Sequence, residues 1–122
     1  MGLDQYAYAI PKSDANRAFD QALPKDAEPF HVWRKHPNLH GWMEKLYRRK
    51  GGTDKFNCRS VLVTSEDLDS LKSDVNRNKL PFTTGFFFGE SYPEDMESDL
   101  LFIEEARKKI AEGNDVYYDS WW

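Results

Sequence analysis

Residues 37–50 read PNLHGWMEKLYRRK and predict the clearest helix of the chain. Pro37 suits a first helical turn. Basic residues in the last turn interact favourably with the negative end of the helix dipole, and Gly51-Gly52 ends the helical pattern. Apolar side chains recur at steps of three and four residues, the spacing of one helical face. These are Leu39, Trp42, Met43, Leu46 and Tyr47. The helix therefore offers one apolar face for packing against a second layer.

Strand and helix signals alternate along the rest of the chain. Tyr6, Tyr8 and Ile10 recur at alternate positions and predict a strand with these three side chains on one face. Further strands are expected over Asn57–Thr64, Thr83–Gly89 and Val116–Trp122, and further helices after Thr64 or Ser65 and after Pro93. The inner stripes of these helices are predicted as Leu68, Leu71 and Val75, and as Met96, Leu100, Ile103 and Ile110. Between Lys12 and Pro29 we expect a long loop with at most a short helix near Ala15–Ala22.

This order of elements predicts an α+β or α/β fold, a two-layer sandwich of about four strands with three helices. A chain of 122 residues has the usual size of a single domain, so residues 1–122 are expected to form one. The aromatic content of 15% favours a folded core in spite of the 31% of charged residues.

Charge and cysteine content restrict the partners and the compartment. The net charge is −4, from 17 basic and 21 acidic residues, so the whole molecule does not attract nucleic acid or an anionic membrane. No membrane-spanning run or targeting segment is apparent, and Cys58 has no second cysteine for an intrachain disulfide. The expected location is the cytoplasm, with no membrane partner.

The residues just before helix 37–50 form the candidate ligand site. Arg34 and Lys35 precede a helix start, where free backbone N–H groups and the dipole favour an anion. Trp33 offers a planar ring for stacking, and His40 offers a hydrogen bond. The competing interpretation assigns Trp42 to the core and leaves Arg34 and Lys35 as solvated loop charges. The favoured ligand is anionic and planar, such as a nucleotide.

Other sites are weaker alternatives. His36 and His40 stand four residues apart and are compatible with two ligands of a metal, but no HExxH or CxxC pattern supports them. The basic cluster Lys45, Arg48, Arg49, Lys50 and Lys55 is the one patch that would attract nucleic acid, and the helix dipole explains most of it. No cofactor is implied. Phosphate-binding loops, dinucleotide fingerprints and a nucleophilic serine elbow are missing from the sequence, which favours binding over catalysis.

The carboxyl terminus is unusually aromatic. Two tyrosines and two tryptophans, Tyr117, Tyr118, Trp121 and Trp122, lie where chains often fray unless they are packed. They are expected to pack either in the core or at an interface with a protein partner or a second copy.

Four segments together resemble a family of small uncharacterised proteins of bacteriophages, including cyanobacterial phages, and of some bacteria. They are MGLDQY at residues 1–6, WRKHPNLHGW at 33–42, TGFFFG at 84–89 and YYDSWW at 117–122, so the resemblance covers nearly the whole chain. Some members carry the label phosphoglycerate kinase, but such a kinase has two domains and several times this length. The resemblance implies a phage origin and supplies no functional residues.

From these observations we expect a small accessory protein of phage type, acting in the host cytoplasm as a non-catalytic binder of an anionic planar ligand or of a host protein. A metal-assisted hydrolase or nuclease using His36 and His40 is one alternative. An oligomeric interaction module built on the terminal aromatic residues is another.

Overall fold

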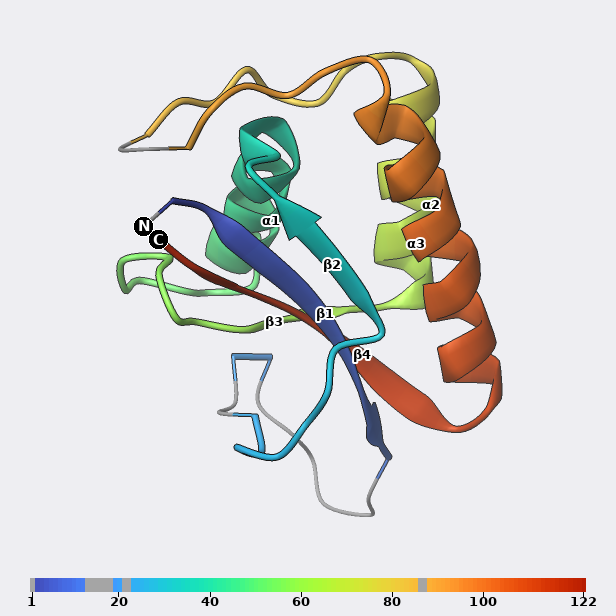
Figure 1. The fold of residues 1–122 in the computed structure, drawn as a ribbon. Helices are drawn as coiled ribbons and strands as arrows, with labels where there is room; N and C mark the ends of the chain where they lie inside the picture. Colours follow the sequence, from blue (N-terminus) through green and yellow to red (C-terminus); the bar gives the residue numbers. More distant parts are fainter. Residues whose placement is uncertain (1, 13–18, 21–22, 86–87) are drawn as a thin grey trace.

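The computed structural model describes residues 2–12, 19–20, 23–85 and 88–122. The described residues form four strands and three helices in the order β1, β2, α1, β3, α2, α3, β4 (Figure 1). The strands are β1 (Asp4–Pro11), β2 (His31–Arg34), β3 (Val61–Val63) and β4 (Asn114–Trp121). The helices are α1 (Pro37–Arg49), α2 (Ser65–Asn76) and α3 (Asp95–Ala111). This is the predicted α+β class with the predicted number of strands and helices.

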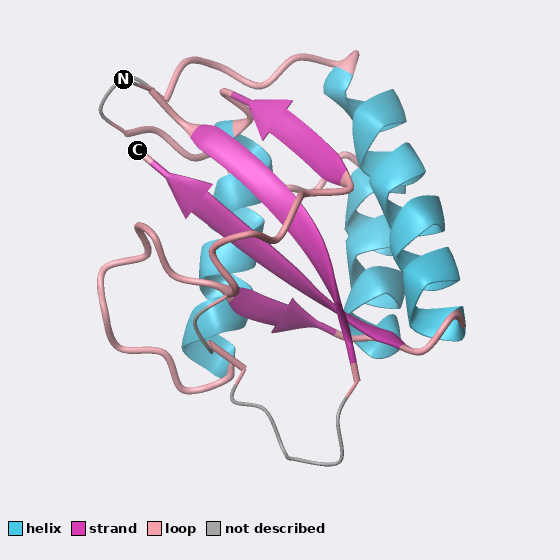
Figure 2. Cartoon of the chain, turned by 60° about the horizontal axis from the view of Figure 1, so that its bottom comes forward, coloured by secondary structure: helices cyan, strands magenta, loops and turns pink. Residues whose placement is uncertain are grey.

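The strands form one antiparallel sheet with the order β2-β1-β4-β3. The two long strands β1 and β4 lie at its centre, so the carboxyl-terminal strand pairs with the amino-terminal one (Figure 2). Ala7 of β1 is paired with both His31 of β2 and Tyr118 of β4. This register places Gln5, Ala7 and Trp33 on one face and Tyr6, Val32 and Arg34 on the other.

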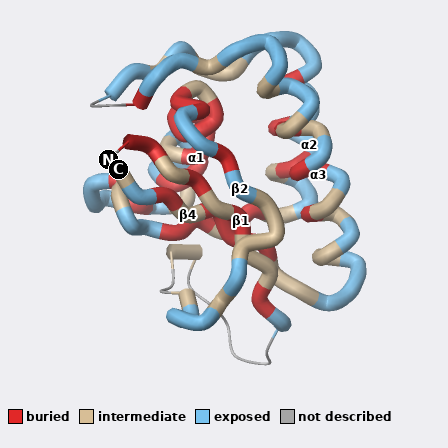
Figure 3. Tube along the Cα trace, viewed as in Figure 1, coloured by how far each residue is buried: buried red, intermediate tan, exposed pale blue. Residues whose placement is uncertain are grey.

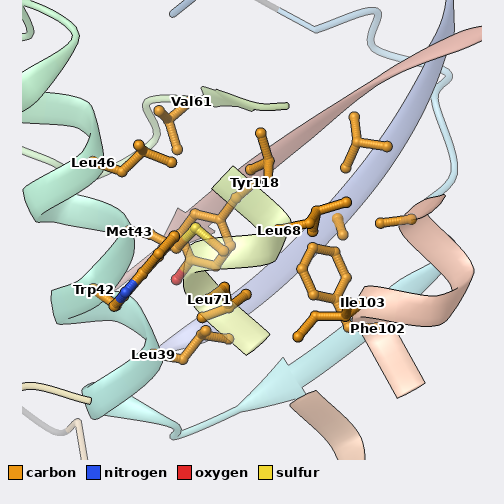
Figure 4. Close-up of a cluster of buried hydrophobic side chains, with 14 of the residues drawn as sticks. Leu39, Trp42, Met43, Leu46, Val61, Leu68, Leu71, Phe102, Ile103 and Tyr118 are labelled. Carbon is orange, nitrogen blue, oxygen red and sulfur yellow. The ribbon is translucent and has the colours of Figure 1, made fainter. Parts of the chain in front are cut away.

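The three helices pack against the first of these faces. One cluster of buried side chains contains residues from every helix together with Ala7, Trp33 and Tyr118 of the sheet. Figure 4 shows Tyr118 among side chains from the three helices. Buried positions follow the inner sides of α1 and α2, whereas the loops are mainly exposed (Figure 3). The opposite face carries Tyr6, Tyr8, Tyr117 and Trp121. No helix of the described residues lies over it (Figure 2), although Tyr117 is fully buried. The described residues therefore form a two-layer sandwich, and we call the sheet face that no described helix covers the uncovered sheet face.

Local sequence signals explain the well-predicted helices. Thr64 caps α2 through a reciprocal pair: its side chain accepts the Asp67 N–H at 3.2 Å, and the Asp67 carboxylate accepts the Thr64 N–H at 2.9 Å. In α1 the predicted apolar face, Leu39, Trp42, Met43, Leu46 and Tyr47, is buried throughout. Pro37 begins α1 and Lys50 caps it, one residue beyond its last turn.

Four expectations about the elements need correction or fall outside the structure. Residues 83–85, 88 and 89 are not in a strand, so the predicted phenylalanine-rich strand is wrong there, and residues 86–87 lie outside the described part. The remaining strand is His31–Arg34, where no strand is predicted from the sequence. Helix α3 buries Asp99, Phe102, Ile103 and Ala106, whereas Met96 is 36% exposed. The expected short helix near Ala15–Ala22 lies mostly outside the described residues.

None of the helices among the described residues combines the length and the apolar character that a bilayer crossing requires.

Candidate functional site

The structure separates the four predicted site residues into a buried pair and an exposed pair. Trp33 lies on the helix-facing side of β2, with 4% of its surface exposed. Its Nε1–H donates to Asp99 Oδ1 at 3.1 Å, and its ring meets Phe102 edge-on with centroids 4.8 Å apart. Little of the indole is left for stacking on a ligand, so Trp33 belongs to the core.

Arg34 and Lys35 remain on the surface. The Arg34 guanidinium lies 3.5 Å from the Asp4 carboxylate and is 64% exposed. Lys35 has a positive φ of 55° and donates its backbone N–H to Leu3 O at 2.8 Å. The stem of its side chain passes close to Gly89, where an added Cβ would lie 3.2 Å from Lys35 Cβ. Because Arg34 points from the uncovered sheet face while Lys35 follows the Gly89 loop, they do not form a cation pair around one ligand position.

His40 is enclosed by aromatic rings inside the molecule. It is 2% exposed, its Nδ1 lies 2.9 Å from the Tyr118 hydroxyl, and its ring stacks on Phe56 with centroids 5.1 Å apart. Phe88 and Trp122 meet the same imidazole edge-on. Burial lowers the pKa of His40 to about 4, so the ring is neutral at physiological pH. An imidazole in this environment supplies packing and one internal hydrogen bond.

The other histidine of the segment, His36, lies in a hydrogen-bonded chain of side chains. Its Nε2 is 2.8 Å from Asp99 Oδ2, and its Nδ1 is 2.6 Å from Ser91 Oγ. Ser91 Oγ also accepts the backbone N–H of Asn38, in the first turn of α1, at 3.1 Å. Gln5 holds the His36 backbone from both sides, accepting its N–H at 2.8 Å and donating to its carbonyl at 3.0 Å. Ser91, His36 and Asp99 thus form a fixed chain between the starts of α1 and α3.

This chain has a cavity beside it, which we call the His36 cleft. The cleft has a volume of about 430 Å³, within the range of small-molecule sites. Its polar lining includes His36, Asn38, Ser91, Asp95 and Asp99, and its apolar lining includes Val75, Leu80, Pro93 and Met96. Sequence reasoning missed this site, although Asp99 carries a signal: it precedes Phe102 and Ile103 by three and four residues and therefore lies on the buried stripe of α3.

A second cavity, which we call the basic cleft, lies along the outer side of α1. It has a volume of about 760 Å³ and is lined by Trp42, Glu44, Lys45, Arg48, Arg49, Asp74, Lys79 and Pro81. Glu44 lies 3.5 Å from Arg48, and Asp74 accepts the Trp42 indole N–H at 2.8 Å. Within the described parts of the chain, no carboxylate pairs with Lys45, Arg49 or Lys79. The basic cleft therefore has an excess of positive charge.

The remaining members of the predicted basic cluster are engaged elsewhere. Lys50 Nζ lies 2.7 Å from Asp67 and also contacts the Leu62 carbonyl. Lys55 Nζ lies 4.7 Å from the centre of the Trp122 ring. His36 and His40, the weak metal alternative, bond different partners, and the described residues contain no group of three or more His, Cys, Asp or Glu side chains arranged to hold a metal ion.

The terminal aromatic residues are also divided between the interior and the surface. Tyr117 and Tyr118 are fully buried within the molecule, and burial raises the pKa of the Tyr118 hydroxyl. Trp122 is held by its indole N–H, which donates to the Phe56 carbonyl at 2.9 Å. Trp121 alone of the four is presented to solvent, with 66% of its surface exposed on the uncovered sheet face.

Comparison of the chain with models of protein families, with curated proteins and with solved structures gave no match. The functional assignment therefore depends on the geometry of the two clefts and of the uncovered sheet face.

Proposed function

We propose that this protein binds a phosphate-bearing small molecule, of the nucleotide-like class, in the basic cleft. The observation that carries the proposal is the set of three cations, Lys45, Arg49 and Lys79, that line one cavity without an acidic partner among the described residues. Like charges around a concave surface concentrate the electrostatic potential, and an anion bound there relieves their mutual repulsion. The ligand meets its strongest contacts in this cleft instead of at Trp33 and His40, which are buried.

The chemistry of the lining favours a phosphate over a single carboxylate. Arg49 offers a planar fork for two phosphate oxygens, while Lys45 and Lys79 act as point charges from two different segments. The volume of about 760 Å³ accommodates a molecule larger than inorganic phosphate. Trp42 contributes apolar wall, although its indole N–H is already taken by Asp74. The setting we propose is the cytoplasm of a phage host cell, as the sequence resemblance implies.

Calorimetric titration with pyrophosphate and ATP at low ionic strength tests the proposal. Lys45→Ala, Arg49→Ala and Lys79→Ala should each weaken binding by about tenfold, since each removes a charge-assisted contact. Lys108→Ala is the matched control, because it removes the same charge from an exposed position near the end of α3. The absence of binding heat for both probes, or an equal loss in the control, would contradict the proposal.

A second candidate function is self-association through the uncovered sheet face. Trp121 and Val32 are 66% and 56% exposed, and both lie on this face. Exposed large apolar side chains on a sheet face that no described helix covers are typical of protein interfaces. Measurement of the mass in solution separates this candidate from the first. A dimer that dissociates in Trp121→Ala supports it, and a monomeric wild-type protein removes it.

A further inference from the structure

We propose that the His36 cleft is a hydrolytic site for small neutral carboxylic esters, in which Ser91 is the nucleophile, His36 the general base and Asp99 the residue that positions the imidazole. The site is distinct from the basic cleft. The segment after α2 separates the two, because Asn78 and Leu80 line the His36 cleft while Lys79 and Pro81 line the basic cleft.

The hydrogen bonds determine which nitrogen of His36 is available as a base. Asp99 is a carboxylate that accepts from Trp33 Nε1–H at one oxygen and lies 2.8 Å from His36 Nε2 at the other. In the neutral imidazole the proton therefore resides on Nε2, where it donates to Asp99, and the lone pair on Nδ1 faces Ser91. The Ser91 hydroxyl, 2.6 Å away, then donates its proton to Nδ1. This is the arrangement of nucleophile, base and orienting carboxylate that acyl transfer requires.

The start of α1 supplies the electrostatic support. The Asn38 N–H donates to Ser91 Oγ at 3.1 Å and belongs to the first turn of a 13-residue helix. The positive end of the helix dipole lowers the cost of negative charge at Oγ while its proton is transferred. Ser91 is half-buried and lines the cleft, so a substrate in the cleft reaches the hydroxyl.

The reaction proceeds in two balanced halves. In the first, Ser91 Oγ attacks the ester carbonyl carbon and passes its proton to His36 Nδ1, and the departing alcohol oxygen then takes that proton as its bond to carbon breaks. In the second, water attacks the acyl-serine, gives a proton to Nδ1 and releases the carboxylic acid, and Ser91 Oγ recovers the proton. Asp99 keeps its hydrogen bond to Nε2 throughout and stabilises the transient imidazolium.

The lining of the cleft restricts the substrate. Val75, Leu80 and Met96 give apolar walls for an acyl group, and the volume of about 430 Å³ limits its size. The Asp95 carboxylate lies 3.7 Å from His36 Nδ1, at the position where an anionic substrate would meet repulsion. Neutral esters are therefore favoured over charged ones.

The protein contains a second serine, histidine and acid that serve as an internal control for this proposal. Ser98 Oγ lies 3.0 Å from His31 Nε2, and His31 Nδ1 lies 3.0 Å from Glu105, so a second serine, histidine and acid are joined in the same way. Ser98 does not line the His36 cleft. If the three side chains alone were sufficient, the two serines would react alike, whereas the proposal makes Ser91 the reactive one.

The test combines covalent labelling with turnover. Wild-type protein is treated with a fluorophosphonate and the modified residue is identified by peptide mass spectrometry, while p-nitrophenyl acetate reports hydrolysis. We expect one adduct, on Ser91, and a rate that falls by roughly a hundredfold in Ser91→Ala and stays unchanged in Ser98→Ala. Asp99→Asn should slow labelling and shift its pH dependence, which a purely structural role would leave unaltered.

Labelling of the wild-type protein needs no variant to fold, and thermal melting of Ser91→Ala shows whether that variant has kept its structure. The proposal is overturned by a missing Ser91 adduct, by equal labelling of Ser98, or by hydrolysis that persists in folded Ser91→Ala. A missing adduct, or hydrolysis that persists in folded Ser91→Ala, would identify the hydrogen-bonded series Ser91, His36 and Asp99 as a structural clamp on the start of α1. Equal labelling of Ser98 would show that the His36 cleft confers no selectivity. None of these results bears on anion binding in the basic cleft, which is measured with different probes.

Discussion

The imidazole Nε2 of His36 lies 2.8 Å from the Asp99 carboxylate, and the two residues are 2% and 1% exposed. This buried contact joins the residue before α1 to the first buried residue of α3. The indole N–H of Trp33 bonds the second oxygen of the same carboxylate. Asp99 therefore connects β2, the start of α1 and α3 at a single point.

Replacement of Asp99 by alanine should be strongly destabilising. It leaves the His36 Nε2 and Trp33 Nε1 donors without their buried acceptor, and each buried donor left unsatisfied costs about 1–3 kcal/mol. Urea denaturation measures the change in unfolding free energy. Asp69→Ala is the control, since its carboxylate pairs with Arg107 on the surface at 2.6 Å and should cost less than about 1 kcal/mol. Equal losses in the two variants would show that the Asp99 contacts contribute little.

His40 should make the fold sensitive to acid. Burial lowers its pKa to about 4 in the folded protein, whereas the unfolded chain has the ordinary value of 6.5. The unfolded state therefore binds the proton first as the pH falls, so stability is complete above pH 6.5 and is lost between that value and pH 4. The difference between the two pKa values corresponds to a loss of roughly 3 kcal/mol in unfolding free energy once the pH is below this window.

The measurement compares wild type with His40→Gln by urea denaturation at pH 7.5 and pH 4.5. Because other acids titrate in both proteins, the relevant quantity is the difference between their losses. Wild type should lose roughly 2–3 kcal/mol more than the variant over this interval. Parallel losses would show that His40 has an ordinary pKa in the folded state.

Gly41 should not tolerate the substitution that helix propensity favours. Alanine in place of glycine inside a helix usually stabilises by about 0.5–1 kcal/mol. Here an added Cβ would overlap the Thr83 side chain, which crosses α1 at this position, and we expect a destabilisation of about 1–3 kcal/mol.

A double-mutant cycle with Thr83→Ala isolates this contact. Removal of the Thr83 hydroxyl takes away the atom nearest to the new Cβ, so part of the cost should be recovered. Thermal or urea denaturation of the four proteins supplies the coupling energy. Additive changes in unfolding free energy would mean that Thr83 does not contact α1 at Gly41.

Local patterns explain why much of the fold follows from the sequence. The apolar positions and terminal signals of helices α1 and α2 lie within or next to each helix, so the sequence alone predicts both. Strand β2 has four residues and is defined by pairs such as Tyr6 with Val32, so no local signal marks it. The phenylalanine-rich segment was misassigned because an apolar run indicates burial without indicating strand pairing. Phe88 is indeed buried, against Trp122 and His40.

The candidate sites were harder to predict than the fold. The side-chain chemistry of Trp33 and His40 predicts ligand contacts, but both side chains bond internal partners, Asp99 and Tyr118. Ser91 and Asp99 are 55 and 63 residues from His36, and only the packing of α3 beside β2 brings them together. The basic cleft was visible in part as a charge cluster on α1, but Lys79 joins it from the segment after α2.

The most direct test of anion binding in the basic cleft is an NMR titration of isotopically labelled protein with pyrophosphate. We predict that the largest saturable shifts of backbone amides map to residues 45–49 and to Lys79, while those of Arg34 and Lys35 change little. Saturable shifts centred on Arg34 and Lys35, or no saturable shifts at all, would contradict the assignment of the ligand to the basic cleft.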